Sequence, residues 1–289
     1  MKMKRSEKLG MFTGLVVGVL LLLISVFMIF QTTCKVWGAE KPANATQQGI
    51  DVSSHQGKID WEQVKNSALA DYAIIRCGYG VNQTDKDDKY WDYNSSECER
   101  LGIPYGTYLY SGADTTAKAK SEAEHVVRLL QGKNLTYPIY YDMEADMLNQ
   151  LSSTQIGNIA KTFLNTMESY GYKNVAVYSN KYLFETKLTA SVFSDYPKWI
   201  AQHSNKCTYQ GSYHMWQYST QGVIPGISEK VDLNYKIGNW TYAGYSSAKK
   251  TVVVKPKATT IKSLRKSGKK AVKITYKKVS GVSGYQIYM

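Results

Sequence analysis

Short β-rich runs alternate with amphipathic helical stretches from residue 49 onward, and this alternation is the feature that most restricts the fold. Strand candidates at 50–53, 72–77, 105–110, 138–143 and 175–179 are each followed by a helical pattern, at 61–67, 89–101, 115–130, 153–170 and 182–189 respectively. Three further strand candidates, at 199–202, 214–218 and 231–235, follow with only loops between them. Five β/α units and then three bare strands predict an α/β fold, a TIM-like barrel that lacks its later helices.

The net charge of +13 is concentrated at the two ends of the chain. Residues 1–48 carry 6 basic and 2 acidic side chains, and residues 241–289 carry 12 basic and none acidic. The remaining residues, 49–240, have 18 basic and 21 acidic side chains. Since the middle is mildly acidic, the composition does not indicate a nucleic-acid-binding domain. The basic tail is instead expected to bind anionic cell-wall polymers or a membrane surface.

The first residues form a membrane-targeting pattern. Lys2, Lys4, Arg5 and Lys8 precede an uncharged, largely apolar run at 9–30. About 20 apolar helical residues span the roughly 30 Å hydrocarbon core of a bilayer. Residues 1–39 are therefore predicted to be a signal or membrane anchor, with everything after the run outside the cytoplasmic membrane. A small residue at Ala39 permits cleavage, whereas the length of the run favours a retained anchor, and both alternatives stay open.

The composition further predicts a linker at 40–48, a barrel at 49–240, a second linker at 241–257 and a β-rich segment at 258–289. The last segment alternates apolar and polar residues. It resembles the opening of a fibronectin type III-like repeat, and a disordered basic tail is the alternative. Cys77 and Cys98 could form a disulfide outside the cell, which leaves Cys207 without a partner. No cysteine or histidine spacing typical of a metal site occurs, so neither a metal nor a cofactor is expected.

The segment YPIYYDMEAD at 137–146 contains the strongest chemical signal. Because side chains alternate along a strand, Asp142 and Glu144 should point the same way, with Cα atoms roughly 6.6 Å apart, while Tyr141 and Met143 face the other layer. Two like charges at that range raise the pKa of one carboxyl group, which supplies a protonated acid beside an ionised partner. Glycoside hydrolysis needs such an acid to protonate the leaving oxygen.

Other polar and aromatic residues fall near the ends of the predicted strands, where the active sites of such barrels lie. Asp51 and Asp232 would add two carboxylates to the pair. Candidate sugar-binding residues are Tyr79, Tyr108, Tyr140, Tyr178, Trp199, Trp216 and Gln217. Aromatic rings stack on sugar faces, but they also fill cores, and core packing is expected for at least half of these rings.

Nine segments in order resemble the lysozymes of glycoside hydrolase family 25. They are GIDVSSHQG at 49–57, IDW at 59–61, YAIIRCGYG at 72–80, GIPYGTYLYS at 102–111, YPIYYDMEAD at 137–146, VAVYSN at 175–180, WIAQ at 199–202, WQYS at 216–219 and VDLN at 231–234. The resemblance implies cleavage of the β-1,4 bond between N-acetylmuramic acid and N-acetylglucosamine in peptidoglycan. It also implies that Glu144 is the general acid, that Asp142 is its neighbouring carboxylate, and that Asp51 and Asp232 complete the site. One departure is Tyr110, where family members often have phenylalanine.

The sequence leaves the role of Asp142 open. A direct nucleophile, an inverting base and a carboxylate that orients the substrate's own 2-acetamido group all fit a D-x-E pair, and the last is favoured here. Two other functions are alternatives to the lysozyme: a non-catalytic wall-binding surface protein and a chitinase-like endoglycosidase. The four intact carboxylates argue against the first, because a binding module has no need of a paired acid.

Overall fold

The computed structural model describes residues 39–241, 261–266 and 272–276. The chain divides after Ala248 into two compact units. The larger one contains a closed barrel of eight strands in sequential order. The strands are β1 (Ala45–Val52), β2 (Tyr72–Tyr79), β3 (Tyr105–Tyr110), β4 (Ile139–Asp142), β5 (Val175–Asn180), β6 (Lys198–Ala201), β7 (Met215–Gly222) and β8 (Val231–Ile237). The predicted eight-stranded barrel is confirmed.

The last strand runs in the opposite direction to the others. Neighbouring strands from β1 to β7 pair in parallel, whereas β8 is antiparallel to both β7 and β1. The reason is the length of the connection: residues 223–230 form a loop too short for a parallel crossover, which needs about a dozen residues or more. This reversal distinguishes the barrel from the all-parallel TIM arrangement.

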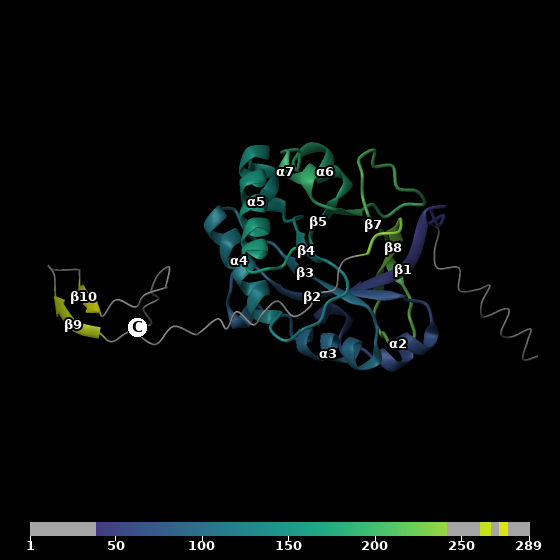
Figure 1. Cartoon of the computed structure of the whole chain (residues 1–289), viewed down its shortest axis with the longest axis horizontal. Helices are drawn as coiled ribbons and strands as arrows, with labels where there is room; N and C mark the ends of the chain where they lie inside the picture. Colours follow the sequence, from purple (N-terminus) through teal and green to yellow (C-terminus); the bar gives the residue numbers. More distant parts are fainter. Residues whose placement is uncertain (1–38, 242–260, 267–271, 277–289) are drawn as a thin grey trace, which may run out of the picture. The chain divides into compact units, whose positions relative to one another are not determined.

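Helices cover the barrel along its first five units. They are α2 (Trp61–Ser67), α3 (Trp91–Leu101), α4 (Thr116–Leu129), α5 (Ser153–Ser169), α6 (Lys181–Thr186) and α7 (Val192–Asp195), with short 3-10 turns η1 (Ser54–Gln56), η2 (Thr84–Lys86) and η3 (Asp146–Gln150). The helices α2 and α3 lie on one side of the barrel, and α5, α6 and α7 lie on the opposite side (Figure 1). As predicted, no helix stands between β6, β7 and β8. The short α7 was not predicted.

The helix α5 shows how local sequence sets an element. Ser152 accepts a hydrogen bond from the Gln155 amide, and the Gln155 side chain accepts one from the Ser152 amide in return, which closes a capping box. The predicted apolar stripe is buried at Ile156, Ile159, Phe163 and Met167. Gly171 follows with a positive φ of 90°, which a glycine adopts without strain. The stripe therefore faces the barrel, and the helix ends where the glycine permits it.

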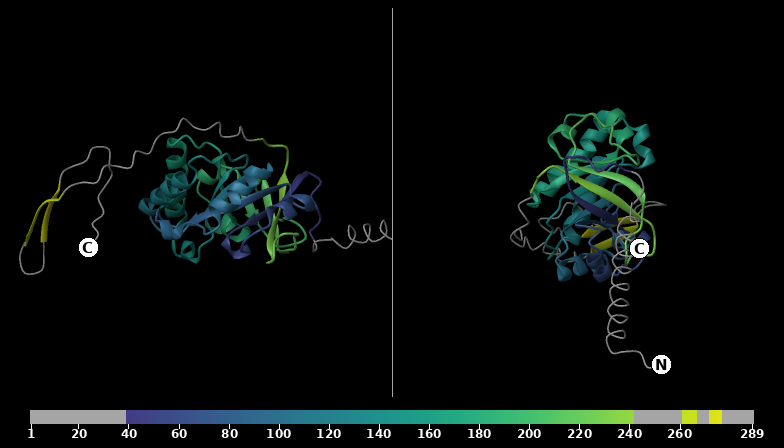
Figure 2. Two further views of the ribbon diagram at one scale, coloured as in Figure 1. Left: turned by 90° about the horizontal axis from the view of Figure 1, so that it is seen from below. Right: turned by 90° about the vertical axis from the view of Figure 1, so that its right-hand side faces the viewer.

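Strand alternation separates two apolar layers. Residues that point outward pack with the helices in the larger core, as Tyr141 and Met143 do. Residues that point inward fill the barrel with a second cluster: Tyr72, Ile74, Tyr137, Tyr140, Ala176, Tyr178, Trp199, Ala201 and Met215. Figure 2 shows the strands enclosing this interior from two further directions. The barrel is thus a packed core, and its polar residues must gather at the strand ends.

Two inward positions are glycines because neighbouring residues occupy the space that a side chain would need. A Cβ atom on Gly49 would lie 2.4 Å from the Tyr72 ring, and one on Gly106 would lie 2.6 Å from the Pro138 carbonyl oxygen and 2.7 Å from the Tyr137 Cβ. The rings of Tyr72 and Tyr137 stack with centroids 4.4 Å apart. Small and large residues therefore alternate around the narrow interior.

The two ends of the chain are described only in part. Among residues 39–241, 261–266 and 272–276, no helix is long and apolar enough to span a bilayer, and the predicted run at 9–30 lies outside these residues. In the second unit, β9 (Ile261–Lys266) and β10 (Val272–Tyr276) pair in antiparallel fashion. The linkers and the rest of the predicted β-rich tail fall largely outside the described residues. Cys77, Cys98 and Cys207 are free thiols.

The glycine at position 106 gives a test of interior packing. Gly106→Ala should lower the free energy of unfolding by about 1–3 kcal/mol or more, since the added methyl group meets backbone atoms that cannot move aside. Gly112→Ala is the matched control, because its Cβ would lie 4.0 Å from the nearest atom, a Glu122 carboxylate oxygen. Denaturant unfolding of the two variants measures the difference. Equal stabilities would contradict this account of the interior.

Candidate active site

Asp51 and Asp232 face each other across the seam made by the reversed strand. They are direct partners in the antiparallel pairing of β1 with β8. The Gln217 amide nitrogen donates to both, at 3.0 Å to Asp51 Oδ2 and 3.1 Å to Asp232 Oδ2. The Asn234 amide also donates to Asp51 Oδ2 at 2.7 Å, while its own oxygen accepts from the Trp199 indole at 2.8 Å. The two carboxyl groups are therefore held by a buried amide network.

Asp142 and Glu144 come from β4 and from the residues just after it. Asp142 aligns with Tyr110 on β3 and with Tyr178 on β5. It is buried, and its Oδ1 atom has no hydrogen-bond partner among the described residues. Glu144 is partly buried and shares a hydrogen bond with Tyr178. As the alternation predicts, Tyr141 lies on the other side of the wall, where its hydroxyl donates to Glu122.

Tyr178 connects the two pairs of carboxyl groups. Its hydroxyl donates to Gln217 Oε1 at 2.9 Å, and the same oxygen lies 3.0 Å from His203 Nε2. The charges of all four carboxylates, those of Glu144, Asp142, Asp51 and Asp232, raise the pKa of Tyr178 in addition to the effect of its burial. The phenol thus lies within electrostatic range of every predicted catalytic residue.

Burial is the main cause of the raised pKa values of Asp51 and Asp232. It raises the pKa of Asp51 well above its ordinary value, and the charge of Asp232 adds to this, while hydrogen bonds from Asn234 and Gln217 oppose it. Burial and the charge of Glu144 raise the pKa of Asp232 to about 6, against an opposing hydrogen bond with Asp51. Both carboxyl groups therefore hold a proton more tightly than a free aspartate does.

Burial is also the main cause of the raised pKa values of Asp142 and Glu144, the D-x-E pair. Burial raises the pKa of Asp142 well above its ordinary value, with the charges of Glu144 and Asp51 adding to the rise and that of Arg76 opposing it. Burial and the charge of Asp51 also raise the pKa of Glu144, whereas its hydrogen bond with Tyr178 lowers it. A carboxyl group in such surroundings can stay protonated and donate its proton to a leaving group.

The predicted aromatic residues lie in different places. Tyr79 is 40% exposed at the end of β2, and Tyr108 is partly buried. Tyr140, Tyr178 and Trp199 fill the barrel interior, and Tyr140 pairs its hydroxyl with His214. Trp216 points away from the barrel interior, packs near Tyr218 and Tyr235, and donates to the Gln202 carbonyl. The structure therefore buries Tyr140, Trp199 and Trp216, and the Gln217 amide donates to two carboxylates.

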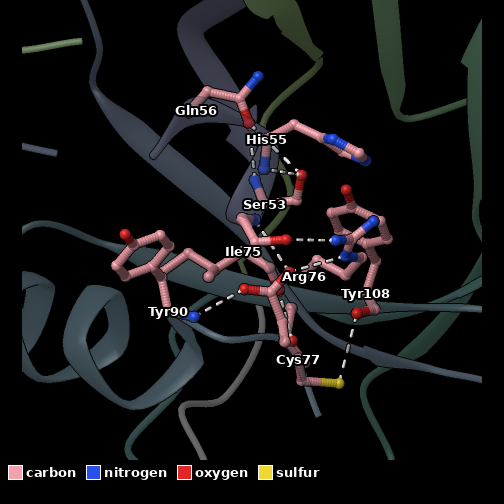
Figure 3. A network of polar contacts seen from close by, with 11 residues as sticks. Ser53, His55, Gln56, Ile75, Arg76, Cys77, Tyr90 and Tyr108 are labelled. Atoms are coloured by element: carbon pink, nitrogen blue, oxygen red, sulfur yellow. Dashed lines mark hydrogen bonds and ion pairs between the residues drawn. The ribbon is translucent and has the colours of Figure 1, made fainter. Parts of the chain in front are cut away.

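Three polar residues of the site were missed in the sequence. Asn234 and His203 contact the amide network, and Arg76, labelled in Figure 3, lies within β2 and forms an ion pair with Asp88. A sequence signal existed for Arg76, because a charged residue inside an otherwise buried strand needs a partner. Its partner, twelve residues further on in a loop, could not be identified from spacing. Within the described part of the chain, no group of three or more candidate ligands could hold a metal ion.

Comparison with known proteins finds a matching family and several relatives. Residues 50–227 match the family described as glycosyl hydrolases family 25. The YegX protein of Escherichia coli K12 is 27% identical over 199 residues, which are 67% of this chain and 70% of YegX. The autolytic lysozyme of Clostridium acetobutylicum is 30% identical over 188 residues, 65% of this chain and 55% of that protein.

Solved structures show the same barrel. The modular autolysin LytC from Streptococcus pneumoniae is 33% identical with a TM-score of 0.60, over 65% of this chain and 46% of LytC. A family 25 glycosyl hydrolase from Bacillus anthracis has a TM-score of 0.61 at 20% identity, over 71% of this chain and 95% of that one. The chain spans about half the length of LytC and of the autolytic lysozyme, and the shared part is the barrel. From its sequence match and its barrel together, this chain belongs to the glycosyl hydrolases of family 25.

Proposed function

We propose that this protein is a lysozyme, an N-acetylmuramidase that hydrolyses the β-1,4 bond between N-acetylmuramic acid and N-acetylglucosamine in peptidoglycan. The observation that carries the proposal is the gathering of Asp51, Asp142, Glu144 and Asp232 in one buried network where the strands end. Among the relatives, one is named an autolytic lysozyme and another lysozyme M1, and LytC has been solved in complex with a synthetic peptidoglycan ligand. The substrate is therefore a cell-wall glycan, and the enzyme acts outside the cytoplasm.

Glu144 serves as the general acid in this proposal. Of the four carboxyl groups it is one of the two that are only partly buried, and it shares a hydrogen bond with Tyr178 that orients it. Its proton passes to the glycosidic oxygen as the bond from that oxygen to the anomeric carbon breaks. In the second half of the reaction the ionised Glu144 takes a proton from water.

Asp142 assists the substrate's 2-acetamido group. The acetamido oxygen attacks the anomeric carbon from the opposite side, which forms a cyclic intermediate and develops positive charge on the amide nitrogen. The Asp142 carboxyl group, at the end of β4 beside Glu144, would accept the hydrogen bond from that N–H. Water then opens the ring, and the configuration is retained. Asp51 and Asp232, fixed by Gln217, add negative potential that favours the cationic transition state.

Loss of the acid should separate catalysis from folding. Glu144→Gln keeps the size of the side chain and removes the proton, so turnover of purified peptidoglycan should fall by about 10²-fold to 10⁴-fold. Asp142→Asn should also impair turnover, and a thiazoline mimic of the cyclic intermediate should inhibit the wild type. Mass spectrometry of the reducing-end sugar measures both activity and specificity.

Several results would contradict parts of this assignment. Near wild-type turnover in Glu144→Gln would move the acid role to Asp51 or Asp232. A sugar ester trapped on Asp142 by a fluorinated slow substrate would make that residue a covalent nucleophile. Release of N-acetylglucosamine ends from chitin, with no cleavage of peptidoglycan, would favour the chitinase-like alternative. A wild type inert on both polymers would favour a wall-binding protein.

The same carboxyl cluster reduces the stability of the fold at neutral pH. The pKa of Asp232 rises from an ordinary 3.8 to about 6 on folding, so the folded state binds a proton more tightly than the unfolded state. Between those two values the folded state holds more protons, and the free energy of unfolding therefore falls as the pH rises from about 4 to about 6. Above that window the full cost of burying the charge is present.

Removal of this charge should therefore stabilise the protein. Asp232→Asn should raise the free energy of unfolding at pH 7 by about 1–3 kcal/mol, with the gain fading below about pH 4, where the wild-type carboxyl is protonated. Asp195→Asn, an exposed position at the end of α7, is the matched control and should change stability little at either pH. Denaturant unfolding at pH 4 and pH 7 measures both. A pH-independent effect of Asp232→Asn would overturn the electrostatic explanation.

We also propose that residues 1–39 hold the enzyme at the outer surface of the cytoplasmic membrane. The chain enters the barrel at the start of β1 and leaves it at the end of β8, and these ends adjoin, since the Gly238 amide donates to the Asn44 carbonyl at 2.8 Å. Both lie at the end of the barrel opposite the carboxyl ends of the strands β1 to β7. An anchor there leaves the catalytic end free to reach the wall.

Orientation can be tested in cells. Protease added to intact spheroplasts should digest the full-length protein, because the basic residues before the apolar run keep that flank in the cytoplasm and the barrel outside. A variant that lacks residues 1–38 should stay in the cytoplasm and remain protected. Immunoblotting against the barrel reads both. Protection of the full-length protein, while it is present in the spheroplasts, would contradict the proposed location.

A further inference from the structure

Glu122 is a fully buried acidic residue that takes no part in the reaction proposed above. It lies on helix α4, which packs side by side with α5 outside the barrel wall (Figure 1). An acidic side chain between helices and a sheet is unfavourable unless hydrogen-bond donors satisfy it. The burial of Glu122 therefore has to be compensated by specific contacts.

Three donors converge on the Glu122 carboxyl group. Its Oε1 atom accepts from the Gly112 amide at 2.8 Å. Its Oε2 atom accepts from the Tyr141 hydroxyl at 2.6 Å and from Ser111 Oγ at 2.9 Å. Burial raises the pKa of Glu122 above its ordinary value, and these three hydrogen bonds oppose the rise. One side chain of α4 is thus bonded both to strand β4 and to the loop that follows β3.

Both of these bonded segments adjoin Asp142. Tyr141 directly precedes it on β4, and the Tyr141 ring stacks on Phe163 of α5 with ring centroids 3.8 Å apart. Ser111 directly follows β3, and its amide donates to the Asp142 carbonyl oxygen at 2.9 Å. Glu122 therefore restrains the Asp142 backbone in two ways, through the residue before it and through the amide that binds its carbonyl oxygen.

Strand β5 fixes the opposite edge of the D-x-E segment, residues 142–144. The Met143 amide donates to the Tyr178 carbonyl at 2.9 Å, and the Met143 carbonyl accepts from Ser179 Oγ at 2.6 Å. Because β4 ends at Asp142, Glu144 lies beyond the regular strand. Side chains two positions apart face the same way only while the backbone between them stays extended. The contacts on the two edges maintain that backbone, and Glu122 secures the edge next to β3.

We propose that Glu122 is a positioning residue, which fixes the backbone of the D-x-E segment from outside the barrel and thereby sets the placement of the Asp142 and Glu144 carboxyl groups. The inference rests on the proposed muramidase function, in which Glu144 protonates the leaving oxygen and Asp142 assists the acetamido group. Displacement of a catalytic group by about 1 Å can lower a rate about 10²-fold. Glu122 acts only through Tyr141 and the Ser111 loop, since it lies on the other side of the wall.

The test compares kcat and KM of purified variants on soluble peptidoglycan fragments. Glu122→Leu removes all three hydrogen bonds, so kcat should fall about 10-fold to 100-fold, while KM should change by less than about 3-fold because no substrate contact is lost. Glu122→Gln keeps an acceptor for the Gly112 amide, and its nitrogen can donate to the two hydroxyl oxygens. Its kcat should stay within about 3-fold of the wild-type value.

Smaller changes keep the test decisive if Glu122→Leu does not fold. Tyr141→Phe retains the ring that stacks on Phe163 and removes only its hydroxyl, and Ser111→Ala removes the other hydroxyl. Each should lower kcat about 3-fold or more and leave KM unchanged, because one of the three restraints is lost.

Tyr93→Phe is the matched control. It also removes a phenol hydroxyl from the helix layer, one that donates to the Ile59 carbonyl at 2.7 Å, but it does so on α3, which packs on β2 and α2. Its kcat and KM should equal those of the wild type. Thermal unfolding shows whether each variant is folded at the assay temperature.

Two results would overturn the inference while the muramidase proposal stands. One is a wild-type kcat in folded Glu122→Leu or, where that variant does not fold, in both Tyr141→Phe and Ser111→Ala. The other is an equal loss of kcat in Glu122→Gln and Glu122→Leu, which would assign the effect to the charge instead of the hydrogen bonds. A wild type that releases no muramic acid ends would instead overturn the proposed function, and the inference with it.

Discussion

Desolvation of four carboxyl groups at one end of a closed barrel is the constraint on which the rest of this structure depends. An ionised carboxylate taken out of water must be hydrogen-bonded, paired with a cation or protonated. Two of these solutions are seen here: Gln217 and Asn234 donate hydrogen bonds to Asp51, and the pKa values of all four carboxyl groups are raised.

Polar residues around the cluster therefore act as its frame. Gln217 uses both polar atoms of its side-chain amide. Its nitrogen donates to Asp51 and Asp232, while its oxygen accepts from Tyr178 and lies near His203. The Trp199 indole donates a hydrogen bond to Asn234, and Asp88 forms an ion pair with Arg76. Because Gln217 and Asn234 have defined partners, Asp51 and Asp232 are held in position before any substrate binds, which is the condition for electrostatic catalysis.

This arrangement also explains why the site lowers the stability of the fold. Burial of like charges is unfavourable, and the fold compensates for it with the packed interior below and the helix layer outside. Tight packing at Gly49 and Gly106 leaves no room for the interior to relax around the charges. The residues that the proposed activity requires therefore lower the stability of the fold.

The sequence by itself determined the order of the elements, the eight strands and the shared direction of Asp142 and Glu144, because these follow from local periodicity and from strand alternation. Its resemblance to family 25 also named the four carboxylates.

Only the tertiary structure decided what those residues contact. The reversal of β8 sets Asp232 opposite Asp51, and closure of the barrel brings Gln217 and Asn234 to the same oxygen. Trp199 and Trp216 differ in the same way. Trp199 lies in the barrel interior and donates to Asn234, whereas Trp216 lies outside the barrel wall near Tyr218 and Tyr235. The pairing of Asn234 with Asp51, 183 positions apart, depends on strand register and on closure of the barrel, and neither can be inferred from the local pattern of the chain.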